Sequence, residues 1–376
     1  MHRKMVISGA AAAAFLAGTC AWALSPPLPW GQSPDMVGWE TFVQVVAPSG
    51  NANNDVEFET WASDEDIYTT NPQWPTVNAP KKLQHSLLGA AGLRHGQTTL
   101  TVPSPSDCNP PHGKAAAAAA KFPAGACIGE EVRRNWATYQ YVVGRGLNTI
   151  AGLKAYYATG KKVDLPADAV EVKADWVAID VLRKWLAANN INLSQQQVRQ
   201  RYYVNQASDG TSYALVAFHF FTKQQKNWVW ADFEHELNPG RCDLIGCHDN
   251  YGAVVPNVNS KAQPWQQYGT CAKSPKVKLM FANAGISPVW SHYCMKGTQI
   301  NYTNPRLLGN SVIEAINADV PIANSSCIGC HYYASFDQNG QPNFPALGTS
   351  PVGPPDPNKI KGYRPNDFIW GIVAAK

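Results

Sequence analysis

The chain has 376 residues, a net charge of +4 and a hydrophobic content of 45%. This near-balanced charge, without a long basic run, argues against a nucleic-acid partner. The length and the 13 tryptophans favour a globular protein with one large core or two modest ones.

The first 23 residues are typical of a secretory signal peptide. His2, Arg3 and Lys4 precede an apolar run from Met5 to Gly18, and Ala21-Trp22-Ala23 has the small-x-small form of a cleavage site. The apolar run is short for a membrane anchor, and no later segment has the length of a transmembrane helix. We therefore expect cleavage after residue 23 and export to the bacterial periplasm. Loss of Arg3 and Lys4 then lowers the net charge from +4 to +2.

The following part, residues 24–128, is rich in Pro, Gly and Asn and is expected to consist mainly of loops. Within it, the alanine run Ala115–Ala120 predicts a short exposed helix.

Two helices and a strand pair are predicted in the middle of the chain. The first helix ends at Gly144 and is indicated by apolar side chains at helical spacing, namely Val132, Trp136, Tyr139 and Val143. The second runs from about Asp175 to Asn189, and its apolar stripe comprises Val172, Trp176, Ile179, Leu182 and Leu186. Two β-branched and aromatic runs, Ser212–Thr222 and Asn227–His235, predict a strand pair.

The C-terminal segment begins at about residue 301. Ser311 and Glu314 have the spacing of a helix capping box, and Pro321 is expected to break or kink the helix that follows. Seven prolines between Pro342 and Pro365 favour an extended chain over further helices.

Within this segment the chain reads Cys327-Ile328-Gly329-Cys330-His331, which has the C-x-x-C-H spacing of a c-type haem attachment site. Two thiols at this spacing reach the two vinyl groups on one porphyrin edge, and the next residue offers its imidazole to the iron. The sequence therefore predicts one covalent haem c on Cys327 and Cys330, with His331 as the proximal ligand.

At this motif the chain resembles the secreted c-type cytochromes of bacteria. Residues 228–235 and 238–242 also resemble segments of large secreted cytochrome-type proteins, a resemblance that names no substrate. In the small electron carriers of the family, the motif lies near the start of the domain and a downstream Met completes the iron coordination. Here no Met or His follows His331. The sixth ligand must come from upstream or from another molecule, or the position is open.

The upstream candidates for a sixth ligand are Met36, Met280, Met295, His85, His95, His112, His219, His235, His248 and His292. His219 and His235 lie in the strand-like runs, where alternation predicts burial, although a lone His on an apolar face is more often a satisfied core residue. Met295 lies beside Cys294, and a disulfide there would make the backbone rigid enough to present a thioether. We retain His219, His235 and Met295 as the candidate sixth ligands.

The remaining cysteines predict disulfides. Loss of Cys20 with the signal peptide leaves eight, and the haem takes two, so an even number remains in an oxidising compartment. Pairing of neighbours is the simplest of fifteen connectivities, among which the sequence does not select: Cys108 with Cys127, Cys242 with Cys247, and Cys271 with Cys294.

A second haem site is an alternative at Cys242, Cys247 and His248, which have the order of the motif with two extra residues between the thiols. A short-loop disulfide with an exposed His is the favoured interpretation. A zinc site formed by Cys242, Cys247, His248 and His235 is a less favoured interpretation, because exported thiols tend to oxidise. The nearby acidic residues favour a solvated loop over an acid–base or cation site, namely Glu234, Glu236, Asp243 and Asp249.

These patterns together predict an α+β fold with mixed helices and a small antiparallel sheet. The expected parts are a signal peptide (1–23), an α+β domain (24–300) and a mainly helical or irregular haem c segment (301–376). Because the last segment is short and Pro-rich, we expect it to pack on the middle region, with the haem at their interface.

The expected function is single-electron transfer with redox partner proteins in the periplasm. The alternative is an oxidoreductase with an open iron site, peroxidase-like or oxidase-like and acting on a small-molecule substrate, or a gas or redox sensor. The size of the chain favours the alternative, since holding one haem takes far fewer residues. No Walker, G-x-S-x-G or H-E-x-x-H motif is present, so the sequence leaves open whether the protein is an enzyme.

Overall fold

The computed structural model describes residues 32–76, 112–207, 210–254, 271–302, 307–343 and 353–376. Its centre is a seven-stranded antiparallel sheet in the order β1-β2-β3-β5-β6-β7, with β4 paired to β5. The strands are β1 (Ala62–Ser63), β2 (Gly129–Arg134), β3 (Val170–Ala178), β4 (Val204–Gln206), β5 (Ser212–Thr222), β6 (Val229–His235) and β7 (Tyr293–Gln299). The fold is therefore α+β, as expected, with a larger sheet than the sequence indicated.

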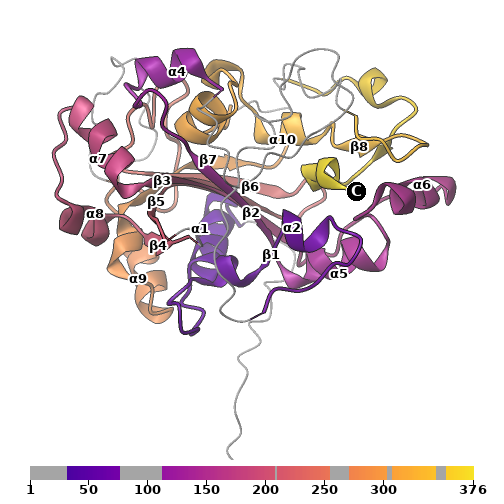
Figure 1. Cartoon of the computed structure of the whole chain (residues 1–376), viewed down its shortest axis with the longest axis horizontal. Coiled ribbons are helices and arrows are strands. Elements are labelled where there is room, and N and C mark those ends of the chain that lie inside the picture. The colour runs from indigo at the N-terminus through magenta and orange to yellow at the C-terminus, as the bar shows by residue number, and fades with distance from the viewer. Residues whose placement is uncertain (1–31, 77–111, 208–209, 255–270, 303–306, 344–352) are drawn as a thin grey trace, which may run out of the picture.

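The α-helices lie on both sides of this sheet (Figure 1). They are α1 (Pro34–Val45), α2 (Asp64–Ile67), α4 (Lys114–Ala119), α5 (Trp136–Gly144), α6 (Ile150–Ala158), α7 (Ile179–Ala188), α8 (Gln195–Arg201), α9 (Pro275–Asn283) and α10 (Cys327–His331). In Figure 1, α1 and α9 lie below the sheet, whereas α4, α10 and the C-terminal residues lie above it. No helix in the described part of the chain combines the length and apolar character needed to cross a bilayer.

One side of the sheet, which we call the apolar face, carries Val172, Ala174, Phe218, Phe220, Phe233 and Met295. These side chains form a core with Trp39 and Phe42 of α1 and Phe281 of α9. The Phe42 and Phe281 rings stack with centroids 5.6 Å apart. Each fully buried aromatic or aliphatic side chain of this kind stabilises the fold by about 1.5–3 kcal/mol.

The other side, which we call the charged face, carries Glu130, Lys173, Asp175, His219, Asp232 and Glu234. Side chains alternate along a strand, and the strand register places Lys173 beside His219 and His219 beside Asp232. These side chains are almost entirely withdrawn from solvent: Asp175, Asp232 and Glu234 are 0% exposed. An isolated buried charge costs several kcal/mol, so the face requires partners.

Ion pairs and the C-terminal segment provide those partners. Lys173 pairs with Glu130 at 2.9 Å, and Lys296 pairs with Glu234 at 2.8 Å. From the C-terminal segment, the Asn310 amide donates to Asp232 at 2.8 Å, and the Asn317 amide donates to Asp175 at 3.0 Å. The segment around residues 307–331 therefore covers the charged face.

Two predicted helices begin later than expected, because strand pairing takes their first residues. Val132 lies in β2, and the helix α5 begins at Trp136 and ends at Gly144. Residues from Val170 to Ala178 form β3, and α7 begins only at Ile179. In both places the apolar residues fit a helical pattern, but their backbone groups hydrogen-bond to an antiparallel partner strand instead.

The described residues of the N-terminal part contain helices that their composition did not indicate. Helix α1 begins with Pro34 in its first turn and buries Trp39 and Phe42, so it belongs to the core. The alanine run forms α4, in which no residue is buried, whereas Ala120, the last residue of the predicted helix, follows α4 and is buried. The expected signal peptide, residues 1–23, lies outside the described residues.

The C-terminal segment consists of short elements. The predicted capping box is displaced by one residue: the Asn310 side chain accepts from Val312 N, and Glu314 accepts from Asn310 N. The turn that follows is a π-helix, η3 (Ser311–Asn317), which ends before Pro321. Beyond α10 lie the strands β8 (Ser335–Phe336) and β9 (Arg364–Pro365) and the short 3-10 helices η6 (Pro357–Ile360) and η7 (Trp370–Ala374).

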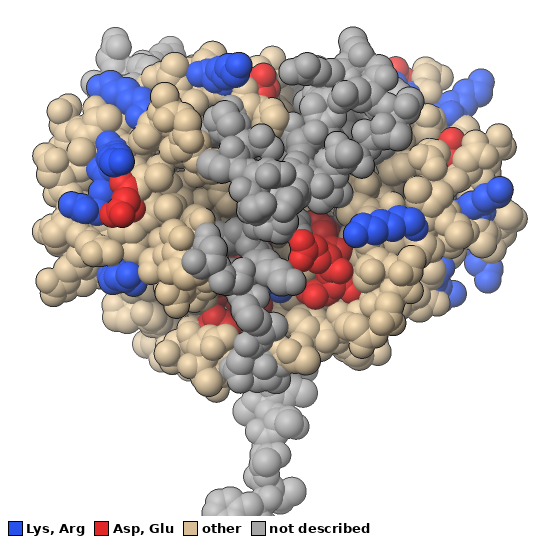
Figure 2. Space-filling model, in the orientation of Figure 1, with Lys and Arg blue, Asp and Glu red and all other residues tan. Residues whose placement is uncertain are grey.

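Charged side chains are dispersed over the face of the molecule that Figure 2 shows. In the orientation of Figure 2, basic side chains are scattered around the periphery, and one acidic group lies nearer the centre.

Candidate functional site

The C-x-x-C-H motif forms the five-residue helix α10, which is attached to the end of β7. Ser326 caps the helix by accepting from Gly329 N at 3.3 Å. Gln299, the last residue of β7, accepts from Ile328 N at 3.2 Å and donates to the Ser326 hydroxyl at 3.1 Å. The motif is therefore fixed to the sheet at its N-terminus, through the backbone N–H of Ile328 and the side-chain hydroxyl of Ser326.

Cys327 and Cys330 are the free thiols of the described chain. Cys327 is buried and Cys330 is partly exposed. Burial, together with the nearby Glu314 carboxylate, raises the pKa of Cys330 to about 11 and raises that of Cys327 well above its usual value. Both are therefore protonated thiols at neutral pH, close together on one short helix.

The other described cysteines are disulfide-bonded. The pairs Cys242–Cys247 and Cys271–Cys294 confirm two of the neighbour pairings. Cys127 is also disulfide-bonded, and its expected partner Cys108 lies outside the described residues. Among the described residues, the cysteines that remain outside a disulfide are therefore the two of the C-x-x-C-H motif.

His331 is held as a neutral imidazole with one defined tautomer. Its Nδ1 lies 2.7 Å from the backbone oxygen of Phe368, and a carbonyl oxygen only accepts, so Nδ1 carries the proton. The ring packs against Trp230 and Phe221, with centroids 4.7 and 5.1 Å away. Burial lowers the pKa of His331 to about 4. The Nε2 lone pair is therefore free to bind a metal.

The carbonyl that orients His331 comes from a turn in an uncommon conformation. Asp367 and Phe368 both have positive φ angles, 46° and 71°. The Asp367 carboxylate anchors the turn by accepting from Lys223 at 2.7 Å and from the Leu165 backbone N–H at 2.7 Å. The sequence did not predict that Phe368 accepts this hydrogen bond from His331, because no sequence pattern distinguishes one backbone carbonyl of a Pro-rich segment from another.

Of the three candidate sixth ligands, the structure places His219 on the same side of the sheet as the motif. It is buried on the charged face, two residues before Phe221, which touches the His331 ring. Its Nδ1 makes no hydrogen bond and lies 3.7 Å from Glu314 Oε1. Burial, with Lys173 and His331 nearby, lowers the pKa of His219 well below its usual value. It is thus a second neutral imidazole.

His235 lies on the opposite side, where both of its ring nitrogens are used. Nε2 bonds the backbone oxygen of Arg201 at 3.0 Å, and Nδ1 accepts from Leu237 N at 3.2 Å. The ring also stacks on Tyr202, with centroids 3.4 Å apart. Neither nitrogen therefore has a lone pair available for iron without loss of these contacts.

Met295 also lies away from the motif, on the apolar face. It is 2% exposed in the core that includes Phe233 and α1. Among the other upstream candidates, His248 bonds the Ile245 backbone oxygen at 2.7 Å, and His292 bonds Glu236 at 2.7 Å. His85 and His95 lie outside the described residues.

The expanded motif at Cys242, Cys247 and His248 contains the short-loop disulfide that the sequence favoured, although His248 is half-buried rather than exposed. The two sulfurs are bonded to each other, so neither offers a thiol for a second haem or for zinc. Among the described residues no group of three or more His, Cys, Asp and Glu has a metal-binding arrangement. Three of the four neighbouring acids have partners within the protein rather than forming a solvated loop: Glu234 pairs with Lys296, Glu236 pairs with Arg201 and His292, and Asp249 accepts from Trp39 Nε1 at 2.9 Å.

The charged face beside α10 is the part of the site that sequence reasoning missed. Burial and the Glu314 carboxylate raise the pKa of Asp232 well above its usual value, and burial raises that of Glu314 to about 7. The signal was present in β3 and β6, where acidic and basic residues recur at every second position, for example Glu171, Lys173 and Asp175. That pattern indicates a polar face covered by another part of the chain.

The donor set fits a c-type haem. It comprises two unbridged thiols and an adjacent neutral imidazole with a free Nε2, on a helix fixed to a rigid sheet. No family model, curated protein or solved structure matches this chain.

Proposed function

We propose that the chain is an exported redox protein with one covalent haem c. Cys327 and Cys330 form the two thioether bonds, and the Nε2 atom of His331 binds the iron. The observation that carries the proposal is the hydrogen bond from His331 Nδ1 to the Phe368 carbonyl, which orients the ring as metal-bound histidines are oriented. When bound, the haem supplies one-electron redox chemistry.

The role we infer is single-electron transfer in the periplasm, with His219 as the sixth ligand. His219 is buried, neutral and on the charged face that the C-terminal segment covers, and its Nδ1 has no hydrogen-bond partner. Two imidazole ligands would hold the iron in a low-spin form, which suits electron transfer. The signal sequence supports export, and redox proteins of the same compartment are the expected partners.

A second candidate function is an oxidoreductase or gas sensor with an open iron position. The contact between His219 and Glu314 favours it, because the 3.7 Å separation leaves an imidazole and a carboxylate with a raised pKa side by side. Such a pair could move protons to or from a small-molecule substrate. The two functions differ in whether His219 occupies a coordination position.

Optical spectroscopy tests the proposal and separates the two functions. The exported protein is examined oxidised, reduced with dithionite, and reduced under carbon monoxide. A low-spin haem c spectrum indifferent to carbon monoxide is expected for the electron carrier, whereas prompt carbon monoxide binding supports an open site. The double variant Cys327→Ser/Cys330→Ser should lose covalent haem, while the matched variant Cys242→Ser/Cys247→Ser should keep it. Covalent haem in the first variant would refute the assignment.

A further inference from the structure

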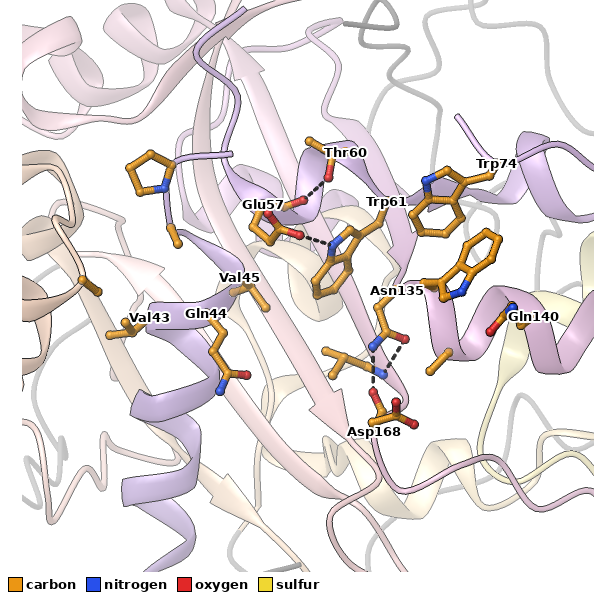
Figure 3. Close-up of a pocket in the computed structure, with 16 residues that line it drawn as sticks. Val43, Gln44, Val45, Glu57, Thr60, Trp61, Trp74, Asn135, Gln140 and Asp168 are labelled. Carbon is orange, nitrogen blue, oxygen red and sulfur yellow. Dashed lines mark hydrogen bonds between the residues drawn. The ribbon is translucent and has the colours of Figure 1, made fainter. Parts of the chain in front are cut away.

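A separate cavity lies on the side of the sheet covered by α1, away from the haem motif. Its volume is about 640 Å³, a size typical of sites for small organic ligands. It lies between the C-terminal end of α1 and the start of α5, and the turn η1 (Glu57–Thr60) closes one side (Figure 3). The proposed haem site does not use any of its lining residues.

Three indoles line this cavity. Trp61 is 8% exposed, whereas Trp136 at the start of α5 is 49% exposed, which is unusual for so large an apolar side chain. Trp74 meets Trp136 edge to face, with centroids 4.9 Å apart, and Tyr139 stacks on Trp136 at 5.5 Å. These two aromatic neighbours hold the exposed indole in place, so a rigid aromatic wall faces the cavity.

The same cavity carries two carboxylates. Glu57 and Asp168 line it, and none of the described lining residues is Lys, Arg or His. Within the described chain, neither carboxylate takes part in an ion pair. Glu57 accepts only from Trp61 Nε1, at 3.2 Å, and Asp168 is held through its backbone oxygen, which accepts from Asn135 at 2.7 Å. Two carboxylates that take part in no ion pair within the described chain therefore line the same cavity as three indoles.

We propose that this cavity binds a small organic ammonium ion. An indole face attracts a cation through its quadrupole, and this attraction strengthens where water is excluded. The two carboxylates add electrostatic attraction inside a concave, partly apolar site. A neutral saccharide could also stack on the indoles, but it would leave both carboxylate charges uncompensated.

Titration of the exported holoprotein with choline tests the proposal. Binding is monitored by tryptophan fluorescence and by calorimetry. The control ligand is 3,3-dimethylbutanol, which has the shape of choline without its charge, and cellobiose tests the saccharide alternative. We expect saturable choline binding and at least tenfold weaker binding of the alcohol. Equal affinity for the two, saturable binding of cellobiose alone, or no binding of choline would overturn the proposal.

Variants locate the binding site. Trp136→Ala and Asp168→Asn should each weaken choline binding about tenfold. Asp180→Asn is the matched control, because the Asp180 side chain lies on α7 and is 82% exposed. Glu57→Gln gives a second test of the charge requirement. An unchanged haem spectrum in every variant verifies folding. Wild-type affinity in Trp136→Ala and Asp168→Asn would contradict the proposed site, whatever the outcome for the haem.

Discussion

The Nδ1 atom of His331 lies 2.7 Å from the carbonyl oxygen of Phe368, 37 residues further along the chain. This bond fixes the orientation of the imidazole that ends the C-x-x-C-H motif. It also ties α10 to the last part of the chain, where the turn at Asp367 and Phe368 is anchored to Lys223. The proposed proximal ligand is thus positioned by residues beyond the motif.

Replacing His331 tests the proximal assignment. His331→Ala removes the proposed iron ligand but leaves the thiols and the signal sequence intact, so export should continue while the low-spin spectrum is lost. His112→Ala is the control, because His112 is exposed and lies outside the site. A wild-type spectrum in His331→Ala would remove the proximal assignment.

The sixth ligand is tested by three single variants. His219→Ala should convert the iron to a high-spin form that binds carbon monoxide, because the proposed ligand is removed. Met295→Leu keeps the volume of the apolar core and should cost less than about 1.5 kcal/mol with no spectral change. His235→Gln should lower stability without altering the spectrum. An unchanged spectrum in His219→Ala, or a changed one in Met295→Leu, would exclude the proposed ligand.

A fragment of residues 301–376 behind the signal sequence should fail to hold a normal low-spin haem. In the whole chain, α10 is attached to Gln299, and the His331 ring packs on Phe221 and Trp230. The fragment lacks all three residues and the charged face. Its spectrum, compared with that of the full chain, is the measurement. A well-behaved cytochrome from the fragment would show that the sheet is dispensable.

The two disulfides should differ in their effect on stability. Cys271 and Cys294 are 23 residues apart, whereas Cys242 and Cys247 are 5 apart. Loop-closure entropy predicts losses of about 3 and about 2 kcal/mol when each pair is replaced by serine. Denaturant unfolding of the two double variants measures both losses. A greater loss for the shorter loop would contradict the entropic account.

Lys273 should make stability depend on pH above neutrality. Burial lowers its pKa from the ordinary 10.5 to about 7. Between these values the unfolded chain binds the proton more strongly, so the free energy of unfolding should rise with pH, by up to about 1.4 kcal/mol per unit. Unfolding curves from pH 7 to 9 measure this slope, and Lys273→Met should reduce it. An equal slope in the variant would exclude Lys273 as the cause.

Local sequence patterns were sufficient to predict several elements of the fold. The hairpin of β5 and β6 was predicted from its aromatic and β-branched runs, and the predicted range Ser212–Thr222 is the observed strand. Gly144 ends α5 as its position indicated. The two disulfides of the described chain join neighbouring cysteines, which is the simplest of the connectivities that the sequence left open. In each case the determining residues are close together in the sequence.

Long-range pairing decided what the sequence did not reveal. β2 and β3 were obscured because Val132, Val172 and Trp176 also fit a helical stripe, and only pairing across the sheet selects the strand. The charged face was missed because its acids become buried only when the C-terminal segment covers them. For the site, the motif gave the thiols and His331, whereas the choice among His219, His235 and Met295 depended on which face of the sheet each occupies.

Mass spectrometry of the exported protein tests the central claim most directly. After denaturation and tryptic digestion, the peptide of residues 307–359, which contains Cys327, Cys330 and His331, should have a mass increased by that of one haem. Recovery of that peptide without haem, from cells that attach haem to a control cytochrome, would contradict the account.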